Sequence, residues 1–482
     1  MVRGPVAGVT RLLKTAAVTC LLTVGVAVGL PPFLSGAWSS AARAPLFLGL
    51  AWAGFALGAL VVLRLPTRTA VVLILAGGLL LPAAAALSPP RSSDDVYRYG
   101  WDARVQLAGV DPYRYPPAAT ELAGLRDPTL WPAHSNWCVG PSSSLTPGCT
   151  LINRPAVHTI YPPVAQGAFV AARAFGPGPY RPYQWFAVAL ALAVTVALLH
   201  GLRRLGHDPR RAVLWAWCPA VALEAGNNAH IDVLAALLTV AGLIVLASSS
   251  ARRGALAGGA LLGLAIATKL TPVLVAPAVA RRRPVAVLGA LAGAVAVVYG
   301  PHVLAVGAAV LGYVPGYLRE EGYADGERFA LLTAVLPAWA ASLVAVAALA
   351  VVGLIVLRTA DPDRPWRGAT VMVGTALLIA APTYPWYALL LVALVALGGG
   401  AWWLAVAAAG YVAQYGQYLR LETAAAQRIG YGLAALIVLA CSVGRSVPVG
   451  ALPGSRVPAV KIATGSTVPT GDGSGAVPED DA

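Results

Sequence analysis

Charged residues are scarce in this sequence, and lysine is almost absent. Asp, Glu, Lys and Arg make up 11% of the 482 residues, and only three of the 34 basic residues are lysines. The hydrophobic share is 58%, which is too high for a series of soluble domains. The sequence also lacks a glycine-rich phosphate loop after a strand-like segment, so a soluble nucleotide-binding domain is not expected. We find no internal repeat.

Long apolar runs are present instead. Runs such as WFAVALALAVTVALL recur along almost the whole chain, and a helix needs about 20 apolar residues to cross a bilayer. Because backbone groups in lipid must be bonded within their own segment, these runs are expected to be helices. The sequence therefore predicts an all-α polytopic membrane protein with a bundle of about 13 transmembrane helices (roughly 11 to 14). The expected spans are approximately 12–34, 45–63, 69–87, 184–202, 212–225, 230–249, 254–268, 270–280, 284–305, 329–357, 368–382, 386–399, 400–418 and 428–444.

Four regions are expected along the chain. Residues 1–87 hold the first three transmembrane helices, and residues 88–183, rich in Pro, Tyr, Trp and charge, form a large first extracytoplasmic loop. Residues 184–446 form further transmembrane helices with short loops. Residues 447–482 are rich in Gly, Pro, Ser and Thr, so they are predicted to be a disordered cytoplasmic tail.

The net charge of +14 does not indicate nucleic-acid binding. The basic residues lie in short clusters between apolar runs, as Arg3, Arg11 and Lys14 do before the first span. Such clusters mark the cytoplasmic side of a membrane protein. They predict a multi-pass protein of the plasma membrane with a cytoplasmic N-terminus and with residues 88–183 outside.

The first polar cluster is SSDDVYRYGWDAR, where the third expected span ends. Asp94 and Asp95 are adjacent carboxylates, and Tyr97, Arg98 and Arg104 follow at helical spacing. A carboxylate at this position can remove a proton from a hydroxyl, and arginine can bind a phosphate. The alternative is a helix N-terminus in which SSDD caps the backbone. The pattern alone does not decide between them.

The order of the motifs is more specific than any one of them. An Asp-x-x-Arg-Tyr element is followed by WDARV, GVDPYRYPP, INRPAVHTIYPPVAQ, an N-x-x-H-x-D-like element and a late YPWY. This series, from Ser92 to Tyr387, resembles the polyprenol-phosphate-mannose-dependent mannosyltransferases of actinobacteria, which are GT-C glycosyltransferases. The resemblance implies a GT-C-like bundle, with Asp95 as the catalytic base and Asp94 as its neighbouring candidate.

A second polar cluster, LEAGNNAHIDV, lies between two apolar segments. Its members Asn228, His230 and Asp232 are expected at membrane depth, where ionisable groups are costly and usually functional. They are predicted to bind the donor or the acceptor, although a polar turn outside the lipid is an alternative. No further ligand set accompanies His230, so neither a metal nor a cofactor is expected.

Two further candidates are a lysine and a group of aromatic residues. Lys269 is the only lysine away from the chain ends and lies at the tip of an expected hairpin over 254–280. Its charge suits a donor phosphate, although an interfacial lysine is an alternative. A group of aromatic residues is predicted to bind sugar, although an aromatic belt at the membrane surface is an alternative. This group comprises Tyr161, Tyr384, Trp386 and Tyr387.

The two cysteines of the outer loop are expected to pair. Cys138 and Cys149 flank a Pro-, Ser- and Gly-rich turn, which can bring them within disulfide distance in an oxidising compartment. The other three cysteines lie in apolar runs and are expected to be packing residues.

These features together predict a membrane glycosyltransferase. It would move a hexose, chiefly mannose, from a polyprenyl-phosphate donor to a lipid- or glycan-linked acceptor on the outer face. Membrane lipid, the donor and a glycolipid or glycan acceptor are the expected partners, and the oligomeric state is not determined. The alternatives are a secondary transporter, a transferase for another lipid-linked sugar such as arabinose, and a non-catalytic protein that binds lipid-linked sugars.

Overall fold

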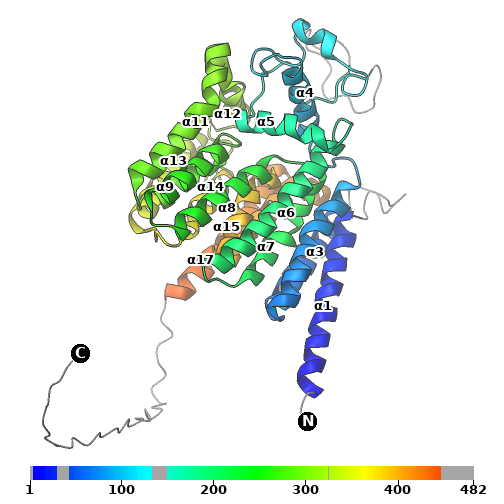
Figure 1. The fold of residues 1–482 in the computed structure, drawn as a ribbon, viewed down its shortest axis with the longest axis vertical. Helices are drawn as coiled ribbons and strands as arrows, with labels where there is room; N and C mark the ends of the chain where they lie inside the picture. Colours follow the sequence, from blue (N-terminus) through cyan, green and yellow to red (C-terminus); the bar gives the residue numbers. More distant parts are fainter. Residues whose placement is uncertain (1–3, 30–42, 133–148, 324, 447–482) are drawn as a thin grey trace, which may run out of the picture. The chain divides into compact units, whose positions relative to one another are not determined.

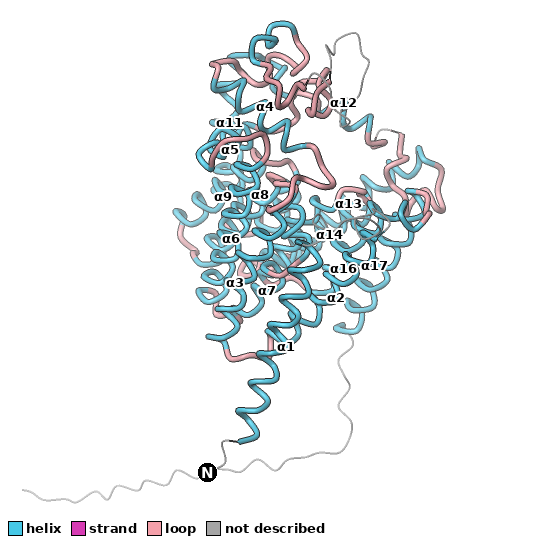
Figure 2. The backbone as a smooth tube through the Cα atoms, turned by 90° about the vertical axis from the view of Figure 1, so that its right-hand side faces the viewer, coloured by secondary structure: helices cyan, strands magenta, loops and turns pink. Residues whose placement is uncertain are grey.

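The structure, a computed structural model, describes residues 4–29, 43–132, 149–323 and 325–446. Every regular element among these residues is a helix, and none of them forms a strand (Figures 1 and 2). The prediction of an all-α protein is therefore confirmed for the described part of the chain. The chain divides into two units, Met1–Cys441 and Ser442–Ala482, and the sites described below lie in the first.

The described residues form seventeen α-helices, numbered in chain order. They are α1 (Gly4–Gly29), α2 (Ala44–Val62), α3 (Thr67–Ala86), α4 (Asp95–Leu107), α5 (Pro163–Ala172), α6 (Arg181–Arg204), α7 (Val213–Ala216), α8 (Asp232–Ser248), α9 (Arg252–Ile266), α10 (Ala276–Val279), α11 (Pro284–Val306), α12 (Val314–Glu320), α13 (Ala338–Thr359), α14 (Pro365–Ala380), α15 (Leu389–Leu397), α16 (Leu404–Tyr415) and α17 (Thr423–Ser446).

Within the described residues, seven helices are long and apolar enough to cross a membrane. They are α1, α2, α3, α6, the stretch from α11 to α12, α13 and α17. The segments Val221–Asn227 and Asp232–Ser248 meet at a bend of 118° and make an eighth if they are counted as one span. A multi-pass membrane protein is supported, but the expected number of about 13 spans is not confirmed.

The difference from the expected number comes from short apolar helices inside the bundle. All nine residues of α15 are buried, so protein rather than lipid surrounds this helix. A helix in that position does not have to cross the hydrocarbon alone. The expected segment 270–280 is likewise divided at its prolines into the turn Thr271–Val275 and the four-residue α10.

The two ends of the bundle differ. Helices α4, α5 and α12 lie at one end, the upper end in Figure 1, and α7 lies at the other. We refer to them as the α4 end and the α7 end. The segment 254–280, expected to be a helical hairpin, consists of α9, the turn Thr271–Val275 and the four-residue α10, so the hairpin stays a prediction. Helix α9 packs closely along α11. Gly259 and Gly263 of α9 allow this approach, because a Cβ atom at either position would meet a backbone carbonyl of α11.

Candidate functional site

The two adjacent carboxylates turn toward the outer loop rather than capping their helix. Asp94 occupies the N-cap position of α4 but makes no side-chain cap hydrogen bond. Asn153 Nδ2 instead donates to Oδ1 of Asp94 at 2.9 Å and to Oδ1 of Asp95 at 2.7 Å. The hydroxyl of Ser93 accepts the Asp95 N–H at 3.3 Å. The carboxylates are thus held in place from the far side of the loop and remain accessible to a ligand.

The electrostatic environment distinguishes Asp94 from an exposed aspartate. Burial raises the pKa of the Asp94 carboxyl above its usual range, and the negative charge of Asp95 raises it further. The hydrogen bond from Asn153 and the charge of Arg154 act in the opposite direction without cancelling the effect. Asp94 therefore retains its proton to a higher pH than an exposed aspartate does.

His230 links the second polar cluster to the first. Its ring is fully buried, with Nδ1 3.6 Å from Oδ2 of Asp95 and Nε2 3.6 Å from Oε2 of Glu224. Both distances are longer than a normal hydrogen bond. The ring also stacks on Trp386, with the centroids 4.0 Å apart. The imidazole therefore lies between two carboxylates and against the aromatic cluster.

The break before α8 positions this histidine. The segment Val221–Asn227 is a π-helix, and Ala229 adopts a left-handed φ of 58°. Asn228 Nδ2 donates to the Ser92 hydroxyl at 2.7 Å and to Oε2 of Glu224 at 2.9 Å. These bonds join the broken helix to the segment before α4, so Asn228 orients other site residues.

Lys269 forms an ion pair with Asp232, another predicted residue of the second polar cluster. Its Nζ lies 3.1 Å from Oδ2 of Asp232. The ammonium also lies 5.6 Å from the ring centroid of Tyr161 and 5.8 Å from that of Tyr387. The side chain is thus held among aromatic rings inside the protein.

The aromatic cluster forms another wall of the same space. The rings of Tyr384 and Trp386 are stacked, with centroids 4.8 Å apart. The Tyr384 hydroxyl donates to Oε1 of Glu321 at 2.9 Å. Burial is the main cause that raises the pKa of Tyr384 to about 12, so this phenol stays protonated as a hydrogen-bond donor at neutral pH.

These residues surround a cavity of about 400 Å³ at the α4 end. The predicted residues that line it are Asp94, Asp95, Arg98, Tyr161, Lys269, Tyr384, Trp386 and Tyr387. His230, Asp232 and Asn228 lie behind this lining and contact it through the bonds described above. The cavity combines carboxylates, one lysine and stacked aromatic rings, which suits a ligand with hydroxyl groups and a phosphate.

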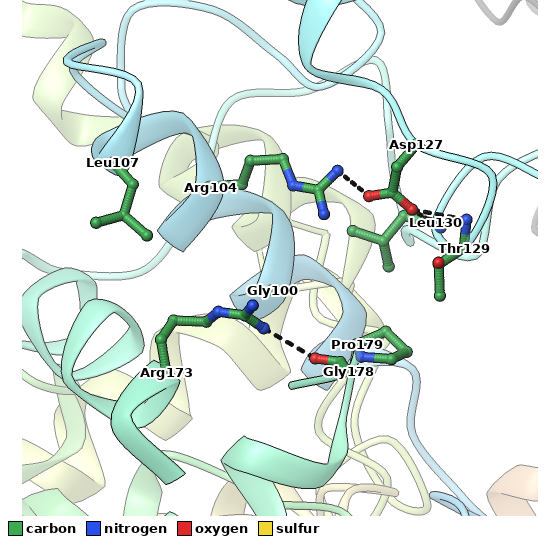
Figure 3. A pocket seen from close by; sticks show the side chains of 9 residues that line it. All are labelled: Gly100, Arg104, Leu107, Asp127, Thr129, Leu130, Arg173, Gly178 and Pro179. Atoms are coloured by element: carbon green, nitrogen blue, oxygen red, sulfur yellow. Dashed lines mark hydrogen bonds and ion pairs between the residues drawn. The ribbon is translucent and has the colours of Figure 1, made fainter. Parts of the chain in front are cut away.

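Of the remaining residues of the first cluster, one lines the cavity and two do not. Arg98 lines the cavity, but it is buried and its guanidinium pairs with Asp102 at 3.0 Å. Tyr97 does not line the cavity and packs edge to face on Tyr180, with ring centroids 6.2 Å apart. Arg104 lies at a separate pocket of about 220 Å³, where it pairs with Asp127 (Figure 3).

The position of Arg104 follows from helix geometry. It comes nine residues after Asp95, which is about two and a half turns at 3.6 residues per turn, so the two side chains project from opposite faces of α4. Figure 3 shows Arg104 facing Asp127, with Arg173 bonded to the carbonyl of Gly178. The structure therefore does not bring Arg104 together with the carboxylates.

Asn153 and Arg154 are among the residues that line the cavity but were not predicted as site residues. Asn153 donates to both carboxylates. Arg154, next to it, has a left-handed φ of 45°, and its Nε donates to Oε1 of Glu320 at 2.9 Å. That hydrogen bond is the largest cause that raises the pKa of Arg154. Both residues lie in the INRPAVHTIYPP motif, which carried the family resemblance but suggested no contact with α4.

The structure describes only one of the two cysteines of the predicted disulfide. Cys149 is disulfide-bonded, whereas Cys138 lies outside the described residues. Their pairing therefore stays a prediction. The remaining cysteines, Cys20, Cys218 and Cys441, are free thiols.

Comparison with known proteins gives one family match, which covers part of the chain. No curated protein and no solved structure gives a significant match. The model of glycosyltransferase family 87 matches residues 159–382. This range includes Tyr161, His230 and Lys269. Trp386 lies just after it, whereas Asp94 and Asp95 lie well before it. The family match and the apolar helices together indicate a membrane glycosyltransferase.

Proposed function

We propose that the protein transfers mannose from a polyprenyl-phosphate donor to a hydroxyl group of a glycolipid or glycan acceptor on the outer face of the plasma membrane. The observation that carries this proposal is the 400 Å³ cavity in which Asp94, Asp95 and Lys269 meet a stacked aromatic wall. The family match supports the class of reaction. The resemblance of the motif series supports the sugar and the lipid carrier.

The reaction is a direct displacement at the anomeric carbon. The carboxylate of Asp95 accepts the proton of the acceptor hydroxyl, while the hydroxyl oxygen forms a bond to the anomeric carbon. The bond from that carbon to the phosphate oxygen breaks, and the electron pair leaves with the polyprenyl phosphate. Asp95 finishes protonated and releases the proton to solvent.

The departing phosphate gains negative charge, and two cations of the cavity are suited to stabilise it. Lys269 lies at the base of the cavity beside Tyr161 and Tyr387. Arg154 lies on the outer loop and is held by Glu320. Both cations have a carboxylate partner without substrate, so a phosphate would compete with Asp232 or Glu320 for them.

The experiment uses the purified full-length protein in detergent with a synthetic short-chain polyprenyl-phosphate mannose and a mannolipid acceptor. A transferase consumes the donor and extends the acceptor without an ion gradient. The 118° break before α8 is also a feature of secondary transporters. Gradient-dependent uptake into vesicles without donor consumption would therefore contradict the proposal, and so would donor binding without turnover.

A further inference from the structure

A second polar cavity lies at the α7 end, remote from the carboxylates. Helix α6 has 24 residues and is therefore about 36 Å long. At its start, Gln184 donates to the carbonyls of Ser88 and Asn227 beside the site. Its last turn leads to His207, which lines the second cavity. The two cavities are thus separated by about the thickness of a membrane.

This second cavity is surrounded mainly by arginine. Its volume is about 120 Å³, several times the roughly 30 Å³ that a water molecule occupies in the liquid. The polar and aromatic side chains that line it are His207, Asp208, Arg211, Arg364, Trp366 and Arg367. The edge of the His207 ring packs on Trp366, with centroids 5.6 Å apart. The space is large enough for a group of the size of a phosphate.

The positive charges of Arg364 and Arg367 are not balanced by carboxylates of the described residues. Neither arginine forms an ion pair with any residue that the structure describes. Asp208, the one carboxylate among the described residues that line the cavity, is engaged by Arg210, with Nη2 2.8 Å from Oδ2. Arg211 also lines the cavity and donates to two backbone carbonyls. Two guanidinium groups without an ion pair therefore line a cavity whose carboxylate already has a partner.

The N-terminus of α14 adds positive potential. Arg364 is the N-cap residue of this 16-residue helix, so the positive end of the helix dipole points into this region. Burial is the main cause that lowers the pKa of His207, and the charges of Arg364, Arg211 and Arg367 lower it further.

We propose that this arginine-lined cavity binds a phosphate group, supplied either by the head group of an anionic membrane lipid or by a free phosphate. Guanidinium groups bind phosphate oxygens through charge-assisted, often bidentate hydrogen bonds. The site is distinct from the sugar-transfer site and does not depend on the function proposed for it. Basic residues at one end of a membrane protein also serve as topology signals, so the experiment must separate binding from topology.

The binding experiment measures the melting temperature of the full-length protein in a neutral detergent at constant ionic strength. One arm titrates inorganic phosphate against chloride, and the other titrates short-chain phosphatidylglycerol against phosphatidylcholine. Binding to the native state raises the melting temperature in a saturable way. The test variant is Arg364→Gln/Arg367→Gln, and the matched control is Arg203→Gln/Arg204→Gln, which removes two exposed arginines at the same end but outside the cavity.

We expect the test variant to weaken binding at least about tenfold for each arginine removed, while the control binds as the wild type does. Saturation by phosphatidylglycerol alone identifies a lipid head group, and saturation by inorganic phosphate identifies a free anion. If neither ligand gives a saturable shift, or if the control loses binding equally, the arginines serve only as topology signals and the proposal is wrong. Because Arg364 and Arg367 are exposed, the unliganded melting temperature of the test variant should match that of the wild type.

Discussion

Two aspartates about two turns apart on α4, Asp95 and Asp102, have different roles. Asp102 is fully buried, pairs with Arg98 and also accepts hydrogen bonds from Thr159 at 2.6 Å and Gln166 at 3.0 Å. Its oxygens are occupied by the protein, so it braces the outer loop. Asp95 lines the cavity with a side chain that is 18% exposed. Only the second arrangement leaves a carboxylate available to a substrate hydroxyl.

The role of Asp95 as the base predicts a large effect of Asp95→Asn. The amide has nearly the same shape but cannot accept the proton, so turnover should fall by about 10²- to 10⁴-fold while donor binding persists. Asp94→Asn is the matched control. It removes the neighbouring carboxylate charge, and that carboxylate accepts a hydrogen bond from the same Asn153 amide as Asp95 does. Initial rates with short-chain donor decide the assignment. Wild-type turnover in Asp95→Asn, or loss of turnover only in Asp94→Asn, would contradict it.

The raised pKa of Asp94 predicts a pH-dependent effect on stability. The native state holds this proton at a pH where the unfolded chain has released it, so the wild type loses stability as the pH rises through that window. Asp94→Asn removes this dependence. The melting temperature of Asp94→Asn relative to wild type should therefore be higher at pH 7 than at pH 4. A difference that is equal at both pH values would show that Asp94 does not titrate in this way.

The ion pair of Lys269 with Asp232 predicts that stability and donor binding can be separated. Lys269→Met leaves a buried carboxylate without its partner, which typically costs about 3–5 kcal/mol. Adding Asp232→Asn should restore most of the melting temperature, because the unpaired charge is removed. Donor affinity should stay reduced about tenfold or more, because the phosphate has lost a cation. If the double variant regains wild-type donor affinity, Lys269 does not bind the phosphate.

At the level of elements, the site is built from the ends of short or broken helices. The N-terminus of α4 supplies the carboxylates, the break before α8 supplies His230, and the turn after α9 supplies Lys269. Non-helical backbone at such breaks is tolerated in a membrane protein where it is covered by protein or lines a cavity. The position of these ends therefore depends on how the helices pack.

The close packing of α9 on α11 predicts a selective effect of glycine substitutions. At Gly263 a Cβ atom would meet the backbone carbonyl of Leu291, whereas Gly289 on α11 has no atom within 4 Å of that position. Gly263→Ala should destabilise the protein by about 1–3 kcal/mol, and Gly289→Ala should not. Melting temperatures of the two variants test this. Equal stability would mean that α9 and α11 do not approach as closely as described.

At the level of the whole molecule, the two ends of the bundle carry cavities that differ in the charged side chains that line them. The carboxylate cavity lies at the α4 end, and the arginine-lined cavity lies at the α7 end. Basic clusters favour the cytoplasmic side, so the α4 end is expected to face outward. With this orientation, the proposed sugar transfer would take place outside the cell.

Cysteine labelling of intact cells tests this orientation. An impermeant maleimide should label Glu327→Cys, which is exposed at the α4 end, without permeabilisation. It should label Arg204→Cys, exposed at the α7 end, only after the membrane is opened. The parent protein supplies the background from its own cysteines. The reverse pattern would place the site in the cytoplasm.

The amino-acid sequence by itself determined the class of the protein and the chemical types of its site residues. Apolar runs and polar tips are local features, because hydropathy and charge can be read from each segment without knowledge of its partners. The carboxylates, Lys269 and the late aromatic cluster were therefore recognisable as candidates without a structure.

Only the tertiary structure decided which apolar helices are enclosed by protein and which polar residues meet. Length and hydropathy do not show that protein surrounds α15 on all sides, so short helices were counted as spans. The contact of Asn153 with both carboxylates and the position of Arg104 on the opposite face of α4 depend on how segments far apart in the sequence pack together. Such contacts leave no periodic pattern in the chain, because each segment satisfies its local helical preference whether or not its distant partner is present.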